Sequence, residues 1–275
     1  MDAADYYQPN MAVELSTSRD ALDYNMCHPQ RGICLIIENS DFSKNPATRH
    51  LSKRTGSDVD CDQIKTLFSR LGFTIIEHKD LKASAVRCAL KQISMLDHSQ
   101  YDCFACFVLT HGDHGSLYAK DGRYGIDYIF CDFLGDKCPT LVGKPKLFFI
   151  QACQGGRVDP GVVVSANSVD GLDVATYFKI PTYADFLIAY STLPGFYSFR
   201  NTEKGSWFIN ALVQVFSDYH NSFDLLSMMT MICHQVAYNY QSNTADPQLS
   251  GLKQVPCITS MLTRRVFLFP KCIQL

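Results

Sequence analysis

Several features that define large protein classes are missing from this chain of 275 residues. No apolar run approaches the ~20 residues that a membrane-spanning helix needs. The chain begins Met-Asp-Ala-Ala-Asp, whereas a signal peptide begins with basic and then apolar residues. Asn-x-Ser/Thr glycosylation sites are absent as well. The net charge of −2 leaves no basic excess for general nucleic-acid binding. We therefore expect a cytoplasmic protein whose partners include neither a membrane nor a nucleic acid.

The sequence also lacks the motifs of nucleotide binding and of metal binding. Neither G-x-x-x-x-G-K-[ST] nor G-x-G-x-x-G is present. Cys103 and Cys106 have a metal-like spacing, but residues three apart on a strand face opposite sides of the sheet. His111 and His114 have no evident further ligand. The sequence therefore implies no metal and no cofactor.

Twelve cysteines raise the question of a disulfide framework. Their spacing is not that of a small stapled scaffold, and a chain of this length can bury a large core without one. Several cysteines stand inside apolar runs, where a free thiol packs as a small hydrophobic side chain. These are Cys34, Cys103, Cys106, Cys233 and Cys257. This placement favours a reducing compartment.

Apolar periodicity predicts strands that alternate with helices. Strands are expected over residues 32–37, 73–77, 103–110, 147–150, 185–191 and 256–261. Helices are expected over residues 57–71, 86–96, 127–134, 208–216 and 225–240. This alternation indicates an α/β fold with a mainly parallel sheet that carries helices on both faces. Residues 42–56 are expected to form a long loop, and residues 157–179 a linker.

The most informative segment is Gln-Ala-Cys-Gln-Gly at residues 151–155, directly after a predicted strand. His111 and Gly112 follow another predicted strand. The carboxyl ends of neighbouring parallel strands meet at one edge of a sheet, so we expect His111 to lie near Cys153. A histidine can activate a thiol for nucleophilic attack. The backbone amides of Gly112 and Cys153 could stabilise an oxyanion.

The pentapeptide resembles the nucleophile motif Q-A-C-[RQG]-G of caspases, which also have a histidine upstream. Residues 143–150, 184–192, 205–208 and 256–263 look like further caspase segments, and the resemblance covers residues 24–269. It implies a caspase-like fold with a central, mostly parallel six-stranded sheet flanked by helices on both faces. It also implies a cysteine endopeptidase that hydrolyses peptide bonds after aspartate in protein substrates. Because Cys153, His111 and the two arginines that match family positions, Arg54 and Arg200, are all present, an inactive caspase-like binding protein is the less favoured alternative.

The resemblance also implies a binding site for the aspartate side chain of the substrate. A buried carboxylate must be paired, and a guanidinium can hold it with two hydrogen bonds. Arg54, Gln151 and Arg200 match the family positions that form this pocket. The neighbouring subsites are implied to include Tyr197, Ser198, Phe199, Asn201 and Trp207. Phe199 replaces a tryptophan that is usual in the family, and residues 241–246 lack an aromatic residue that some executioner members use.

Activation by proteolysis is implied in the same way. We expect a short mobile prodomain over residues 1–23, a large subunit over 24–170 and a small subunit over 171–275, together forming one caspase domain. Asp170 is the preferred linker cleavage site and Asp173 the second option, while Asp20 and Asp23 are candidates for removal of the tail. The short tail favours an executioner caspase of apoptosis, made as a zymogen and cut by an upstream initiator caspase. A homodimer of large/small subunit pairs and inhibitor-of-apoptosis proteins are the other implied partners.

Overall fold

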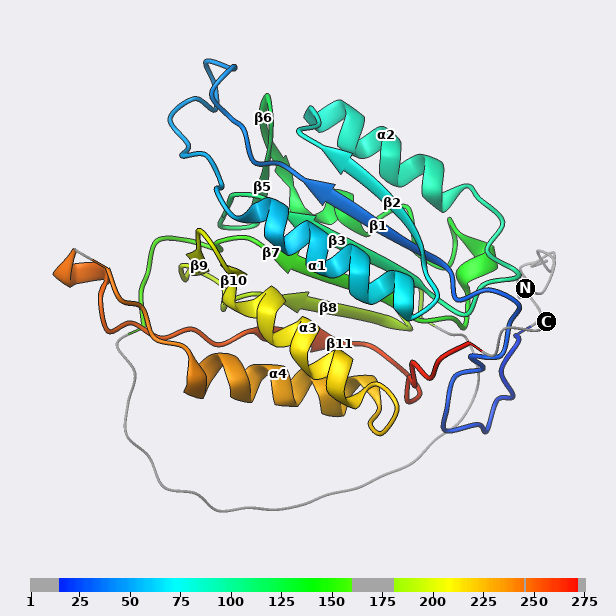
Figure 1. Cartoon of the computed structure of the whole chain (residues 1–275). Helices are drawn as coiled ribbons and strands as arrows, with labels where there is room; N and C mark the ends of the chain where they lie inside the picture. Colours follow the sequence, from blue (N-terminus) through cyan, green and yellow to red (C-terminus); the bar gives the residue numbers. More distant parts are fainter. Residues whose placement is uncertain (1–14, 160–180, 245, 272–275) are drawn as a thin grey trace, which may run out of the picture.

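A six-stranded sheet forms the centre of the molecule in the computed structural model, which describes residues 15–159, 181–244 and 246–271 (Figure 1). Its strands lie in the order β11-β8-β7-β3-β1-β2. They are β1 (Ile33–Glu38), β2 (Thr74–Lys79), β3 (Phe104–Leu109), β7 (Lys146–Gln151), β8 (Phe186–Tyr190) and β11 (Cys257–Ser260). All six predicted strands are therefore confirmed.

Five of these strands run parallel, and only the edge strand β11 runs antiparallel to its neighbour β8. Every residue of β1, β3 and β7 is buried. Their nearly unbroken apolar runs follow from this position, because central strands of a parallel sheet are covered on both faces. The predicted mainly parallel sheet is confirmed.

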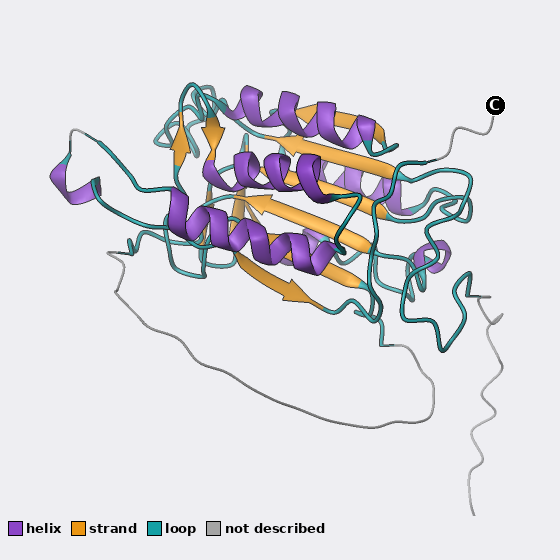
Figure 2. Ribbon diagram, turned by 60° about the horizontal axis from the view of Figure 1, so that its bottom comes forward, coloured by secondary structure: helices purple, strands orange, loops and turns teal. Residues whose placement is uncertain are grey.

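Helices cover both faces of the sheet. Helices α1 (Ser57–Arg70), α3 (Trp207–Tyr219) and α4 (Leu225–Asn239) lie side by side on one face (Figure 2). Helix α2 (Ala83–Ser94) packs its apolar stripe into the core of the opposite face. Cys103 belongs to the first core and Cys106 to the second, as their spacing predicts.

Several local predictions were wrong. The helix expected over residues 127–134 is only a single 3-10 turn, η1 (Ile126–Ile129), because the chain then turns so that both Phe130 and Phe133 become buried. Ser57 and Asp58 are residue types that often cap a helix, but Gly56 occupies the N-cap of α1 in a left-handed conformation. Leu96 lies beyond the end of α2 and is exposed.

Two small sheets were not predicted. The first contains β4 (Gly112–Asp113), β5 (Ser116–Ala119) and β6 (Gly122–Gly125), and the second is the hairpin of β9 (Arg200–Asn201) and β10 (Gly205–Ser206). Both are built from strands of two to four residues, which are too short to show a clear alternation of apolar and polar positions.

The described part of the expected tail is held against the body of the protein. Backbone hydrogen bonds join Leu22 and Tyr24 to Arg265, whose guanidinium also contacts Asp23 at 2.6 Å. The Tyr24 hydroxyl donates to Asp185 over 2.7 Å. The tail segment that leads into β1 is thus attached to a segment near the C-terminus.

The eleven cysteines within the described residues are all free thiols. Within that part of the chain, none of the helices has the length and apolar character required to cross a membrane.

Asp102 is a buried anion whose removal tests the packing of the chain ends. It lies between Arg31, Lys271 and His28, and the Arg31 contact measures 3.0 Å. We expect Asp102→Ala to lower the free energy of unfolding by about 3–5 kcal/mol, because it leaves a buried guanidinium unpaired. Urea unfolding of the purified chain measures this loss.

The matched control is Asp62→Ala, which removes an exposed carboxylate paired with Lys65. It should cost less than about 1 kcal/mol. Equal losses for the two variants would contradict a structural role for the buried cluster.

Candidate active site

The register of the central sheet brings the predicted histidine and cysteine together. Leu109 at the end of β3 pairs with Gln151 at the end of β7. His111 and Cys153 each lie two residues further along these neighbouring parallel strands. They therefore emerge at the same edge of the sheet, and both line a single cavity of about 190 Å³.

The thiol of Cys153 is partly buried and lies beneath the segment that follows β8. The backbone N–H of Ser198 donates to Sγ over 3.4 Å, and Sγ lies 3.9 Å from the Ser198 carbonyl oxygen. Burial raises the pKa of this thiol, although the Ser198 amide and the two nearby arginines act in the opposite direction. The resting sulfur is therefore protonated at neutral pH.

His111 is held by a long loop that follows β1. Its Nε2 lies 2.8 Å from the backbone oxygen of Ser52, and its ring packs against buried Phe42 with the centroids 5.1 Å apart. Since a carbonyl only accepts, Nε2 carries the proton and Nδ1 is left as the basic nitrogen. Burial, together with Arg54 and Arg200, lowers the pKa of His111 to about 4.

Gly112 opens β4 and lies directly against the backbone of Cys153. A Cβ atom at Gly112 would lie 2.2 Å from the carbonyl oxygen of Cys153 and 3.0 Å from the Cβ of Ala152. Only glycine fits this close approach. The backbone of Gly112 consequently lies against that of Cys153.

Two guanidinium groups face the same cavity. Arg54 is 2% exposed and donates to the Ser57 hydroxyl over 2.6 Å. Arg200 lies at the start of the β9–β10 hairpin and donates through Nε to the Thr55 carbonyl over 2.9 Å. Burial and the neighbouring Arg200 lower the pKa of Arg54 to about 10. Two cations that line one cavity, Arg54 fully buried and Arg200 half-buried, favour an anionic ligand there.

Gln151 completes the floor of the cavity. Its Nε2 donates to the Ser198 hydroxyl over 2.9 Å, which in turn donates to Ser191. Its Oε1 is buried and has no hydrogen-bond partner among the residues that the structure describes. A half-turn of the amide would let Ser198 donate to the oxygen and would aim the amide N–H groups at a ligand acceptor.

The remaining predicted residues divide between two cavities. Tyr197, Ser198 and Phe199 line the cavity of Cys153. Asn201 and Trp207 instead line a neighbouring cavity of about 520 Å³. The rings of Phe199 and Trp207 stack with centroids 4.7 Å apart and so form the wall between the two cavities.

Sequence reasoning missed some residues of the two cavities. They are Ser52, Thr110, Thr244 and Leu249 in the first cavity and Tyr240 in the second. Tyr240 lies one residue before the segment that lacks an aromatic side chain, and its ring is 5.5 Å from that of Trp207. An aromatic residue at the end of a predicted helix was the available signal for it.

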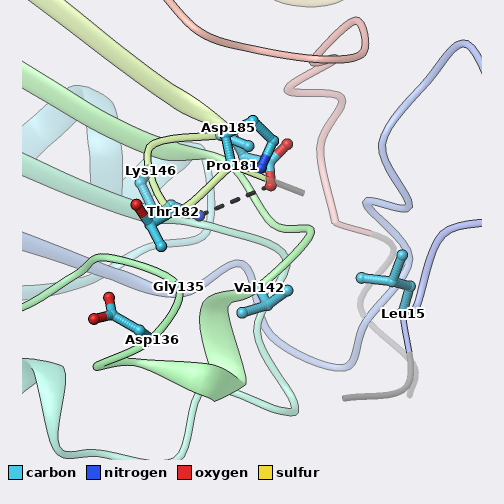
Figure 3. A pocket seen from close by; sticks show the side chains of 9 residues that line it. Leu15, Gly135, Asp136, Val142, Lys146, Pro181, Thr182 and Asp185 are labelled. Carbon is cyan, nitrogen blue, oxygen red and sulfur yellow. Dashed lines mark ion pairs between the residues drawn. The ribbon is translucent and has the colours of Figure 1, made fainter. Parts of the chain in front are cut away.

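A further cavity lies at the other end of the sheet, around Lys146 and Asp185 at the starts of β7 and β8 (Figure 3). Lys146 is buried, 4.0 Å from Asp185, and donates to the carbonyls of Leu141 and Lys144. Lys146 therefore makes structural contacts within the protein in this cavity. Among the residues that the structure describes, no group of three or more His, Cys, Asp or Glu side chains is placed to hold a metal ion.

A thiol, an imidazole and two arginines that line one cavity at a strand edge are the arrangement expected of a cysteine hydrolase. Comparisons with known proteins agree with this class. A model of the caspase domain matches residues 31–267. The chain is 44% identical to Caspase-1 of Spodoptera frugiperda over 258 residues, covering 94% of this chain and 85% of that protein.

Other relatives give the same result. Caspase drICE of Drosophila melanogaster is 42% identical over 261 residues, covering 94% of this chain and 75% of that protein. The crystal structure of Caspase-1 from Spodoptera frugiperda matches with a TM-score of 0.88 and 41% identity, over 96% of this chain and all of that chain. The chain belongs to the caspase family and is a cysteine-type endopeptidase with the caspase fold.

The protonation of the resting site is open to direct measurement. Because burial raises the pKa of Cys153 and lowers that of His111, both groups are neutral at pH 7. We expect the rate of Cys153 alkylation by iodoacetamide to keep rising from about pH 6 to about pH 9, in step with the thiolate fraction. A thiolate–imidazolium pair would instead give a rate that is flat over this range, and that profile would contradict the geometry.

Proposed function

We propose that this protein hydrolyses peptide bonds that follow an aspartate and acts as an executioner caspase in apoptosis. The supporting observation is the convergence of Cys153, His111, Arg54, Gln151 and Arg200 on one cavity. The family membership described above supports the same reaction.

Selection of aspartate follows from the charges that line the cavity. Arg54 and Arg200 offer several N–H donors in a space too small for many side chains, and the amide of Gln151 adds one more. A carboxylate accepts such donors with two hydrogen bonds to each guanidinium. An uncharged side chain would bring no negative charge to the cavity and would displace water from the two guanidiniums, which is costly. Tyr197, Phe199, Asn201 and Trp207 would then contact the residues that precede the aspartate.

The substrate carboxylate also prepares the acid–base chemistry. Burial lowers the pKa of His111, and Arg54 and Arg200 lower it further. A bound carboxylate offsets their field and thereby raises the pKa of the imidazole toward neutrality, where general acid–base catalysis is most effective. Binding of the correct side chain is in this way coupled to activation of the base.

The reaction then proceeds through an acyl-enzyme. His111 takes the thiol proton of Cys153, the sulfur attacks the carbonyl carbon, and the amides of Gly112 and Cys153 bind the resulting oxyanion. The imidazolium protonates the leaving amine as the C–N bond breaks. His111 next deprotonates a water molecule, which attacks the thioester and releases the new carboxyl terminus. The Ser52 carbonyl keeps the imidazole in the required tautomer throughout.

Proteolytic activation is part of the proposal. Asp170 and Asp173 lie outside the described residues, so their use rests on the sequence. For the tail we favour Asp20, which occupies an exposed turn. Asp23 is a poorer target, because its carboxylate is paired with Arg265 and the following residue, Tyr24, is buried. With Asp20 as the tail site, the large subunit begins at Ala21 instead of residue 24, and the boundary between the subunits stays between residues 170 and 171.

The wider setting of the protein is also proposed from its family. We infer a zymogen that is cut by an initiator caspase, restrained by inhibitor-of-apoptosis proteins and active as a dimer. Strand β11 is the edge of the sheet and pairs only with β8 among the described strands, so it offers a free edge to a second copy. The free thiols favour the cytoplasm.

Peptide hydrolysis tests the proposed reaction. The processed protein should cleave a tetrapeptide amide ending in Asp on the order of a hundredfold more efficiently than one ending in the uncharged isostere Asn, because only the former pairs with both guanidiniums. Cys153→Ala should abolish cleavage, whereas Cys27→Ala, at an exposed cysteine, should leave it unchanged. Equal cleavage of the two peptides would refute the aspartate pocket.

Processing is tested on the full-length Cys153→Ala chain, which cannot cut itself, with a trace of active enzyme. We expect fragments that end at Asp170 and a mature large subunit that begins at Ala21, measured by intact mass. Adding Asp170→Ala should prevent separation of the two subunits, whereas Asp159→Ala, which precedes Pro160, should not. Unaltered fragment masses in the Asp170→Ala chain would reject this linker site.

A further inference from the structure

The proposed aspartate pocket is assembled from two separate parts of the chain. Arg54 precedes helix α1, while Arg200 belongs to the β9–β10 hairpin on the far side of the linker. Any cut in the linker therefore leaves the two arginines on different polypeptides. The pocket then depends on non-covalent contacts between α1 and the hairpin for its dimensions.

The central contact between these parts is made by Asp60 on α1. One carboxylate oxygen of Asp60 accepts from the Ser206 backbone N–H over 2.7 Å, and the other accepts from the Ser206 hydroxyl over 2.6 Å. Both side chains are completely buried. Charge-assisted hydrogen bonds to a carboxylate are among the stronger polar contacts in proteins.

Ser206 is the residue through which this contact reaches the pocket. It is the direct partner of Arg200 in the antiparallel register of the β9–β10 hairpin. A shift of Ser206 away from α1 must therefore carry the backbone of Arg200 with it. The Asp60 carboxylate thus fixes the position of Arg200 through one intervening residue.

Close backbone packing supports the same alignment. At Gly205, where φ is +87°, an added Cβ would lie 2.4 Å from Asp60 Oδ1. At Gly56, also at φ +87°, an added Cβ would lie 2.9 Å from the carbonyl oxygens of Asn201 and Thr202. The two glycines let the hairpin sit directly on the start of α1, where Arg200 also donates to the Thr55 carbonyl over 2.9 Å.

The charges around the two arginines also support a positioning role for Asp60. Arg54 and Arg200 repel each other, whereas Asp60 attracts both, and Glu38 is the other buried carboxylate that faces them. Asp60 does not itself fill the aspartate pocket, because it does not line the cavity of Cys153 and its two oxygens point to Ser206.

We propose that Asp60 is a positioning residue that sets the separation of Arg54 and Arg200, and hence the selection of aspartate, by holding Ser206. The proposal rests on the proposed function and goes beyond it, since Asp60 and Ser206 do not line the cavity of Cys153. According to this proposal, a buried contact between the two processed subunits controls how well the substrate fits.

Two substitutions separate position from charge. Ser206→Ala leaves one buried oxygen of Asp60 without a donor, a loss that outward movement of the hairpin would relieve by admitting water. Asp60→Asn removes the charge but can keep both contacts, because its oxygen accepts from the Ser206 N–H while its amide donates to the hydroxyl. Asp58→Asn is the matched control, since Asp58 is exposed on the same helix.

The variants are compared as processed enzymes on tetrapeptide amides ending in Asp or Glu. We expect Ser206→Ala to raise KM for the Asp peptide on the order of tenfold. The value of kcat should change little, because at saturating substrate the carboxylate still occupies the pocket and offsets the charges of the two arginines. The preference for Asp over Glu should fall. Asp60→Asn and Asp58→Asn should change KM less than about twofold, and alkylation of Cys153 by iodoacetamide should be unaffected in all three.

Several results would overturn the proposal. An unchanged KM and Asp/Glu preference in Ser206→Ala would do so, as would a fall in kcat and in the alkylation rate together with a lower melting temperature, which indicates general destabilisation. A large effect of Asp60→Asn with none of Ser206→Ala would assign the role to charge instead. If the unmodified enzyme fails to cleave Asp peptides, the proposed function fails, independently of this contact.

Discussion

The site depends on the electrostatic repulsion between two guanidinium groups, those of Arg54 and Arg200, that line one cavity. Arg54 is almost fully buried and Arg200 is half-buried. Burial and the neighbouring Arg200 lower the pKa of Arg54, and burial lowers the pKa of Arg200. The Thr55 carbonyl and two buried carboxylates, Asp60 and Glu38, stabilise the two guanidiniums. The two guanidiniums would attract a substrate carboxylate, because the electrostatic attraction between opposite charges is stronger in a partly buried site than in water.

The topology of the sheet explains why this charge lies beside a nucleophile. Parallel strands all present their carboxyl ends at one edge, and the loops that follow β1, β3 and β7 supply Arg54, His111 and Cys153 at that edge. Arg54 and Arg200 also lower the pKa of His111. The charges that would bind the substrate carboxylate therefore also affect the proposed base. The buried Lys146–Asp185 cluster is spatially separate, at the opposite ends of the same strands.

Elementary patterns predict the scaffold of this site well. Unbroken apolar runs identify the buried strands, and the i, i+3, i+4, i+7 spacing of Ile64, Leu67, Phe68 and Leu71 identifies the stripe by which α1 packs on the sheet. The approach of His111 to Cys153 follows from strand ends alone. These predictions succeed because burial of apolar surface imposes a period on the sequence.

The other parts of the site could not be obtained in this way. The two arginines were assigned through family resemblance, since a lone arginine in a loop has no local signal for burial. The Asp60–Ser206 contact joins residues 146 apart in the chain, and only the packed backbone reveals it. The short strands around Gly112 and Arg200 are fixed by tertiary contacts rather than by propensity.

The central claim is that a substrate carboxylate lies between Arg54 and Arg200 while its carbonyl carbon reaches Cys153. A crystal structure of the processed protein with a peptide aldehyde ending in aspartate tests this directly. The account predicts a thiohemiacetal on the sulfur of Cys153, with the aspartate carboxylate at about 3 Å from both guanidiniums. A carboxylate in solvent, or an aldehyde bound to any other cysteine, would contradict it.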